Sequence, residues 1–162
     1  MRGKDKKGRQ WLLFGGSLSI TIALLHVAII LIGAPAYRFT GAGEIMAGWA
    51  EQGQPWAALI TLGVAAVFAV WGLYGFSGAG AVRRLPLLRT GLIVIAALYT
   101  LRGLMFFSEV WLLMRIARIL EAQYPVFSFV SLCAGVVHIV GIVLRWERLS
   151  PAKVVETAGK QS

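Results

Sequence analysis

The sequence predicts an all-α integral membrane protein, a four-span antiparallel transmembrane helical bundle with short interfacial helices on the periplasmic side. Two features of the composition favour this fold. Of the 162 residues, 58% are apolar and 14% are charged, whereas soluble domains average about 25% charged residues. The apolar residues also gather into four long blocks. Each block can form a helix that crosses a hydrocarbon core of about 30 Å.

The first block holds 22 residues without an acidic or basic side chain. It is longer than the apolar part of a signal peptide, so we interpret it as a span and not as a cleaved leader. The other three blocks contain a single charged residue, Arg102. The predicted spans are residues 11–32, 56–76, 90–107 and 126–144, within one transmembrane domain, 11–144, that lies between tails at 1–10 and 145–162.

The net charge of +9 is unevenly distributed. The two tails and the connection between spans 2 and 3 carry the positive surplus, whereas the connections on the other side are neutral or slightly acidic. Cytoplasmic segments of membrane proteins carry such an excess of Lys and Arg, so both termini are predicted to be cytoplasmic. Basic tails of this kind lie against anionic lipid head groups, and this placement argues against nucleic-acid binding.

The stretch "VRRLPLLRTGLIVIAALYTLRGL" resembles segments of small bacterial inner-membrane proteins, without indicating a family. The four spans and the distribution of Lys and Arg predict a multi-pass protein, and we expect it in the bacterial inner membrane. Membrane lipids are its expected partners, and a homo-oligomer or a larger membrane complex is an open possibility.

The connection after span 1 contains a segment with helical spacing, Glu44–Glu51. Ile45, Met46 and Trp49 share one face, and the two glutamates share another. We expect a short interfacial helix with Trp49 in the lipid and the carboxylates in water. A second connection, residues 108–124, either extends span 3 or forms another interfacial helix, and the sequence leaves both open.

A seven-residue pattern occurs twice, as "YRFTGAG" at 37–43 and "YGFSGAG" at 74–80. Each copy follows a span. Tyrosine favours the membrane interface, and glycine supplies the left-handed conformation that ends helices. We interpret both copies as helix ends on opposite sides of the membrane. A true inverted duplication is the alternative.

Three ionisable residues lie inside the predicted spans, namely His26, Arg102 and His138. Such residues are costly in lipid and usually face the protein interior. His26 follows a stripe of small residues on span 1, and small residues surround His138 on span 4, so both histidines are expected to face other helices.

A polar pocket open to the periplasmic side is therefore predicted, with His26, Tyr99 and Arg102 at its base and Glu109 and Glu44 above. Arg102 would hold an anionic or carbonyl group, and His26 would move a proton near neutral pH. In the alternative, Arg102 extends to Glu109 or to lipid phosphate, and His26 bonds a neighbouring helix.

No cofactor or metal is predicted. The two histidines, His26 and His138, differ in depth by roughly 12 Å along the spans, which opposes a haem bound by both. A zinc site needs three or four ligands. The single cysteine, Cys133, forms no intrachain disulfide and is expected to pack as a small apolar residue. His138 is expected to bond a serine or a backbone carbonyl in the core.

Three hypotheses for function follow. The first is binding of a lipid or other hydrophobic anion in the outer-leaflet pocket. The second is a small membrane enzyme that uses His26 with Glu109 or Glu44 for proton transfer on a lipid-soluble substrate. The third is a structural subunit that packs against itself or a larger partner. The sequence does not decide whether the protein is an enzyme, nor does it identify a ligand.

Overall fold

The computed structural model describes residues 2–115 and 123–149, which form helices and short connections, with no strand in these two ranges. Four of the helices are long and apolar enough to cross a membrane, which confirms the predicted all-α fold of a multi-pass membrane protein. The helices are α1 (Arg2–Ile32), α2 (Ala34–Thr40), α3 (Glu44–Glu51), α4 (Pro55–Gly78), α5 (Leu88–Arg115), α6 (Gln123–Leu144) and α7 (Trp146–Leu149).

All four spanning helices are longer than the predicted spans, and the difference is largest for α1 and α5. α1 begins at Arg2, so the basic tail is part of the helix. α5 continues to Arg115, and residues 108–115 therefore extend the third span. No proline or glycine follows Gly103 in α5 to end it earlier. Residues 116–122, the rest of that open connection, lie outside the described residues.

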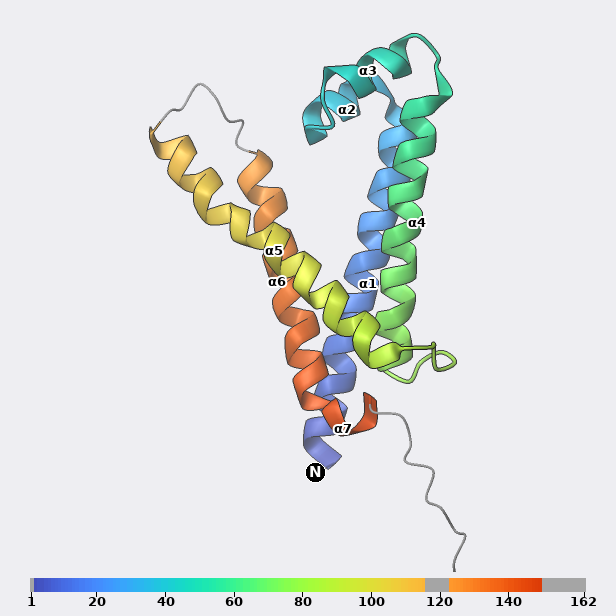
Figure 1. Cartoon of the computed structure of the whole chain (residues 1–162), viewed down its shortest axis with the longest axis vertical. Helices are drawn as coiled ribbons and strands as arrows, with labels where there is room; N and C mark the ends of the chain where they lie inside the picture. Colours follow the sequence, from blue (N-terminus) through green and yellow to red (C-terminus); the bar gives the residue numbers. More distant parts are fainter. Residues whose placement is uncertain (1, 116–122, 150–162) are drawn as a thin grey trace, which may run out of the picture.

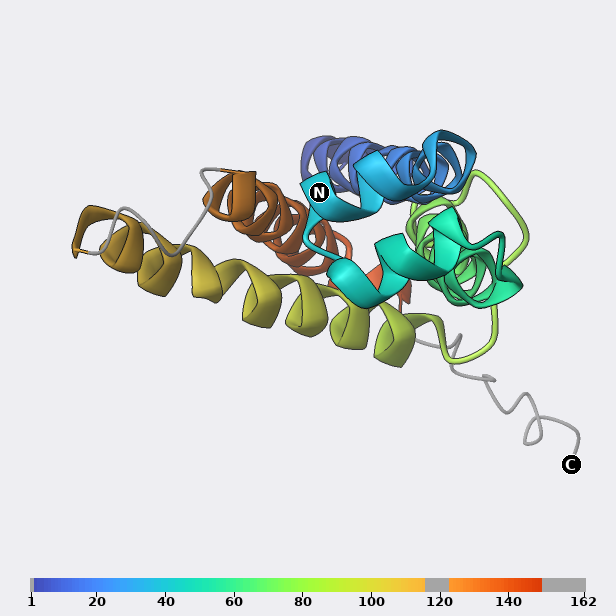
Figure 2. The same ribbon diagram turned by 90° about the horizontal axis from the view of Figure 1, so that it is seen from above.

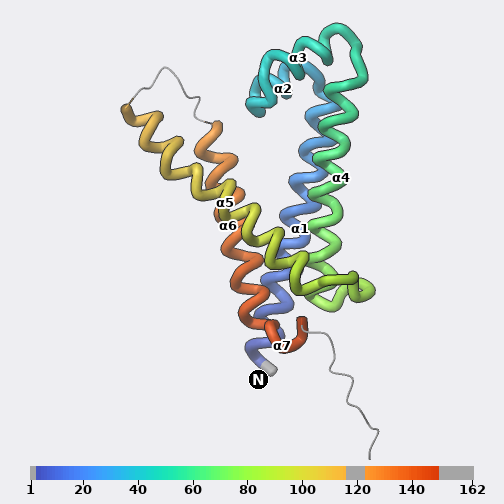
Figure 3. The backbone as a smooth tube through the Cα atoms, viewed as in Figure 1, coloured from blue at the N-terminus to red at the C-terminus, as the bar shows by residue number. Residues whose placement is uncertain are grey.

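The four long helices form two pairs. α1 packs along α4, and α5 packs along α6 (Figure 1). The pairs meet at the end of the molecule that holds the start of α1 and α7, here named the terminal end (Figure 3). They diverge toward α2 and α3, here named the cap end, and the view from above shows the same divergence (Figure 2). The predicted bundle is thus an open arrangement of two helix pairs.

Glycine allows the backbones within each pair to approach closely. A Cβ atom built on Gly75 of α4 would lie 2.7 Å from Cα of Gly16 in α1. Gly103 of α5 lies against the backbone of Leu132 in α6 and leaves no room for a Cβ atom. Small residues at such contacts are the usual means of helix association in membranes.

An apolar core joins both pairs at the terminal end. It is built from buried residues of α1, α5, α6 and α7 and of the loop after α4. Its members are Leu12, Ala79, Leu88, Leu92, Ala96, Ile142 and Leu149. Arg145, just after α6, adds polar contacts, because its Nε donates to Asp5 at 2.9 Å and its Nη1 donates to the Gly78 carbonyl at 2.7 Å.

The cap end is a hairpin of two short helices. α1 ends at Ile32, and Gly33 then turns the chain with a φ of +81°. Pro35 lies in the first turn of α2, where its missing N–H costs no hydrogen bond, so this proline starts a helix that the sequence analysis did not predict. α3 has the predicted bounds, and its position at a membrane interface stays a prediction.

The partly buried Trp49 of α3 packs against the small cluster of the cap, which includes Tyr37 of α2. The cap also reaches across to the other pair. The side chain of Gln123, at the start of α6, donates to the Phe39 carbonyl at 3.1 Å. The rings of Phe39 and Phe127 meet edge to face at 6.4 Å. α2 therefore bridges the two pairs at the open end.

The two copies of the repeated pattern end helices, as predicted. In the first copy α2 ends at Thr40, and Gly41 follows with a φ of +76°. In the second copy α4 continues to Gly78, and Gly80 has a φ of +72°. The first copy lies at the cap end and the second at the terminal end, so the two do not contribute to one site (Figure 1).

Candidate functional site

Arg102 lies near the middle of α5, because the helix continues for 13 residues after it. Its side chain is 43% exposed. One guanidinium nitrogen, Nη1, donates to the buried hydroxyl of Ser128 in α6 and lies 3.4 Å from Oε1 of Glu109. Arg102 therefore extends toward Glu109, as in the alternative to the predicted pocket, and Ser128 is a further partner that was not predicted.

Glu109 lies two turns after Arg102 on the same face of α5, and its side chain is only 13% exposed. One carboxylate oxygen, Oε1, faces Arg102. The other, Oε2, is buried and has no hydrogen-bond partner among the described residues. A carboxylate in this position stays close to its arginine, since breaking a poorly solvated ion pair costs more free energy than breaking an exposed one.

Tyr99, one turn before Arg102, belongs to a different group of side chains. Its hydroxyl lies 2.9 Å from the Ser19 hydroxyl of α1. Ser19 in turn donates to the Gly15 carbonyl at 3.1 Å, so Tyr99 is the donor in the first bond. The ring of Tyr99 also packs edge to face on Trp71 of α4, at 5.0 Å. Trp71 is partly buried and packs against the cluster that contains Tyr99.

His138 completes this interior layer. It is fully buried, and its ring stacks on Tyr99 at 5.5 Å. Nδ1 donates to the Ala134 carbonyl at 2.8 Å, as predicted for a core histidine. Nε2 is therefore an acceptor, and it has no hydrogen-bond partner among the described residues. A Cβ atom on Gly15 would lie 2.8 Å from this ring, so α1 covers it closely.

His26 is only partly buried and lies apart from the arginine. Its Nδ1 donates to the Ile22 carbonyl in its own helix at 2.8 Å. Its ring contacts Phe68 of α4 at 5.2 Å. Among the described residues no hydrogen bond joins His26 to Glu44, Glu109 or Arg102. The predicted proton transfer from His26 has no described carboxylate partner, and the enzyme hypothesis stays a prediction.

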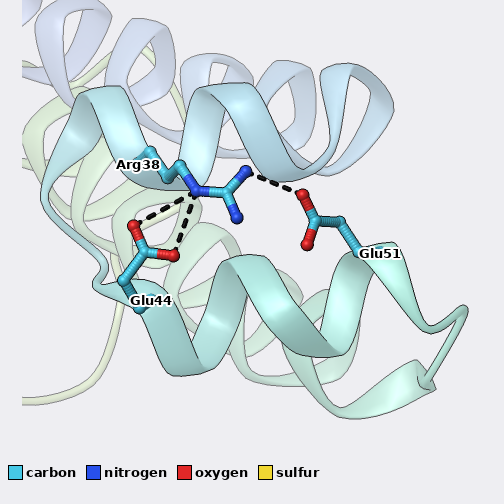
Figure 4. A network of polar contacts seen from close by, with 3 residues as sticks. All are labelled: Arg38, Glu44 and Glu51. Atoms are coloured by element: carbon cyan, nitrogen blue, oxygen red, sulfur yellow. Dashed lines mark hydrogen bonds and ion pairs between the residues drawn. The ribbon is translucent and has the colours of Figure 1, made fainter.

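Glu44 belongs to the cap and not to the group around Arg102. Arg38 of α2 donates through Nε to both Glu44 oxygens, at 3.1 and 3.2 Å, and through Nη1 to Glu51 at 2.8 Å (Figure 4). Arg38 thus holds both ends of α3. Its guanidinium lowers the pKa of the Glu51 carboxyl below its ordinary value, chiefly by the hydrogen bond between them.

The predicted pocket residues therefore lie in separate places. Arg102 and Glu109 are together, Tyr99 is in the interior layer, His26 packs on Phe68, and Glu44 is in the cap. The reason is that α5 runs obliquely across α1 and α4 (Figure 1), so equal depth along two spans does not bring side chains into contact. Arg102 lies at a half-exposed surface and not in an enclosed pocket.

Two residues that the sequence analysis did not place in the site have contacts that depend on the tertiary structure. Ser128 lies about one turn after Pro125. This position near the start of α6 was the only indication in the sequence that a polar group would lie there. Ser19, which bonds Tyr99 across the helix pairs, is the other. Cys133, expected to pack inside, is exposed on α6.

Comparison with known protein families, with curated proteins and with solved structures finds no match.

Proposed function

We propose that this membrane protein binds the charged head of an amphipathic anion, a lipid or another hydrophobic anion, at Arg102. The observation that carries the proposal is the half-exposed guanidinium near the middle of an apolar helix. An arginine has five N–H donors. The described hydrogen bonds of Arg102 use only Nη1, so Nε and Nη2 have no hydrogen-bond partner among the described residues. An unpaired donor in a hydrocarbon environment costs several kcal/mol. An anionic ligand oxygen would accept hydrogen bonds from Nε and Nη2.

The surroundings favour a ligand with an apolar part. Leu101 and Met105 flank Arg102 on α5, and they are 63% and 52% exposed. An acyl chain or similar group would cover this surface while the charged head binds the guanidinium. Glu109 already offsets part of the arginine charge, so a small soluble anion would gain little here, and burial of apolar surface would supply most of the affinity.

The side of the membrane follows from the charge distribution. If the basic terminal end faces the cytoplasm, the cap end and the second half of α5 face the periplasm of a bacterial inner membrane. The ligand would then enter from the outer leaflet.

The test is native mass spectrometry of the protein extracted gently from its own membrane, beside two variants on the same helix. Arg102→Gln removes the proposed contact. Arg115→Gln removes the same charge from the exposed last turn of α5. We expect a discrete adduct in the wild type and in Arg115→Gln, and its loss in Arg102→Gln with unchanged helix content. An adduct that persists in Arg102→Gln would exclude Arg102 as its site.

A further inference from the structure

A second basic site lies at the terminal end, away from Arg102. It is a pocket of about 200 Å³ between the end of α4, the start of α5 and the segment after α6. Three arginines line it, Arg84, Arg145 and Arg148, and no carboxylate is among the lining residues that belong to the described ranges. The proposed function makes no use of this pocket.

Two of the arginines are held in place by backbone carbonyls. Arg84 donates through Nη2 to the Leu149 carbonyl at 2.7 Å. Arg145 donates through Nη1 to the Gly78 carbonyl at 2.7 Å, and its side chain is only 12% exposed. The pocket is therefore formed before a ligand arrives, and less conformational entropy is lost when one binds.

The third arginine supplies positive charge that no acidic side chain of the described residues offsets. Asp5 pairs with Arg145 at 2.9 Å and compensates its charge. Arg148 is exposed on α7, and its guanidinium has no hydrogen bond or ion pair with another described residue. A dianionic or monoanionic group in the pocket would give Arg148 a partner.

The pocket lies at the level where spanning helices end, because α4 ends at Gly78, α5 begins at Leu88 and α6 ends at Leu144. In a membrane this is the level of the lipid head groups. The neighbouring Trp146, a residue type typical of that level, is 43% exposed and carries the Arg89 guanidinium 3.2 Å from its ring centroid.

The size of the pocket and the residues that line it limit the class of ligand that it can bind. Pockets for drug-sized molecules hold about 300–1,000 Å³, so this pocket suits a head group more than a whole molecule. Leu88 and Leu149 provide an apolar wall beside the arginines. Arginine binds phosphate with paired, charge-assisted hydrogen bonds, and its planar group suits phosphate better than lysine does.

We propose that this pocket binds a phosphate group, either the head-group phosphate of an anionic lipid or soluble phosphate. Arg84 and Arg145 form the fixed part of the site, and Arg148 closes over the bound phosphate from α7.

The experiment uses the full chain in a neutral detergent, titrated with short-chain phosphatidylglycerol, with short-chain phosphatidylcholine and with inorganic phosphate, and followed by native mass spectrometry. The test variant is Arg148→Gln. The matched control is Arg83→Gln, which removes the same charge from an exposed residue next to Arg84 that does not line the pocket. Both substitutions leave the described hydrogen bonds of Arg84 and Arg145 in place.

We expect one bound phosphatidylglycerol per chain. Its affinity should fall about tenfold in Arg148→Gln, as for loss of a charged hydrogen bond. In Arg83→Gln the affinity should change by less than about twofold. If millimolar phosphate competes with the lipid, the site is assigned to soluble phosphate. If it does not compete, the site is assigned to the lipid. Equal weakening in both variants, or equal binding of phosphatidylcholine, would overturn the proposal. Arg102→Gln leaves this binding unchanged, so the two sites are tested separately.

Discussion

The terminal end and the cap end are held together by different kinds of contact. At the terminal end, both helix pairs share a buried apolar core, and Arg145 binds Asp5 and the Gly78 carbonyl. At the cap end, the pairs separate, and an exposed arginine with two glutamates holds α2 to α3. Buried apolar area and close backbone contact stabilise far more than exposed ion pairs do. The stability of the chain therefore resides mainly at the terminal end and in the interior layer around Tyr99 and His138.

The largest effect is expected where two backbones touch. Gly75→Leu places a large side chain against Cα of Gly16. Overpacking of this kind typically lowers the free energy of unfolding by about 1–3 kcal/mol, and occasionally by more. Gly63→Leu is the control in the same helix, because no atom lies within 4 Å of its Cβ position. Thermal unfolding in detergent should separate the two variants clearly. Equal unfolding temperatures would mean that α1 and α4 do not pack at Gly75.

A smaller loss is expected in the interior layer from Tyr99→Phe. The substitution removes the hydroxyl that donates to Ser19, and a buried hydrogen bond contributes about 0.5–1.5 kcal/mol. Ser19→Ala and the double variant complete the cycle, and a coupling energy near this value is expected from chemical denaturation. Strict additivity of the two substitutions would show that the hydroxyls do not interact.

The neighbouring His138 is expected to tolerate replacement better than Tyr99 does. Its Nε2 is buried without a partner among the described residues, and such a group costs about 1–3 kcal/mol. Leucine lacks that group, but it also loses the stacking on Tyr99, worth about 0.5–1.5 kcal/mol, and the hydrogen bond to the Ala134 carbonyl, worth about 0.5–1.5 kcal/mol. These terms nearly cancel, so His138→Leu should be close to neutral in the same denaturation assay. A clear loss of stability would point to an unrecognised partner of Nε2.

The smallest effect is expected at the cap. The hydrogen bond from Arg38 lowers the pKa of Glu51 below its ordinary value of 4.5. The bond is therefore complete above that ordinary pKa and is lost as the pH falls through the lowered value. A carbon-detected NMR titration of Glu51 should give a midpoint below 4.5 in the wild type. Arg38→Gln should return it to the ordinary value, with little change in global unfolding because both groups are exposed.

The long helices were predictable from the sequence because a span needs about 20 apolar residues, a signal that depends only on local composition. The same holds for α3, whose two faces differ in polarity, and for the glycines that end helices. The Arg102–Glu109 pair could also be predicted, since residues seven positions apart in a helix lie on the same face.

The contacts between helices were not predictable in this way. Depth along each span suggested that His26 and Tyr99 would join Arg102, but the crossing of α5 over α1 and α4 brings Tyr99 to Ser19 and His138 instead. The crossing depends on where glycines allow backbones to approach, as at Gly75 and Gly103. The helix α2 was missed because proline both ends and begins helices, so Pro35 by itself does not indicate that a new helix starts there.

The divergence of the two helix pairs has a consequence for the shape of the surrounding membrane. If the long helices cross a bilayer, the chain occupies more area in the leaflet at the cap end than in the leaflet at the terminal end (Figure 1). A wedge of this form relieves packing stress in a bilayer that bends so that the cap-side leaflet is the expanded one. We expect the protein to concentrate in the smaller vesicles of a mixed population when the cap faces outward, and to be depleted from them when it is inserted the other way.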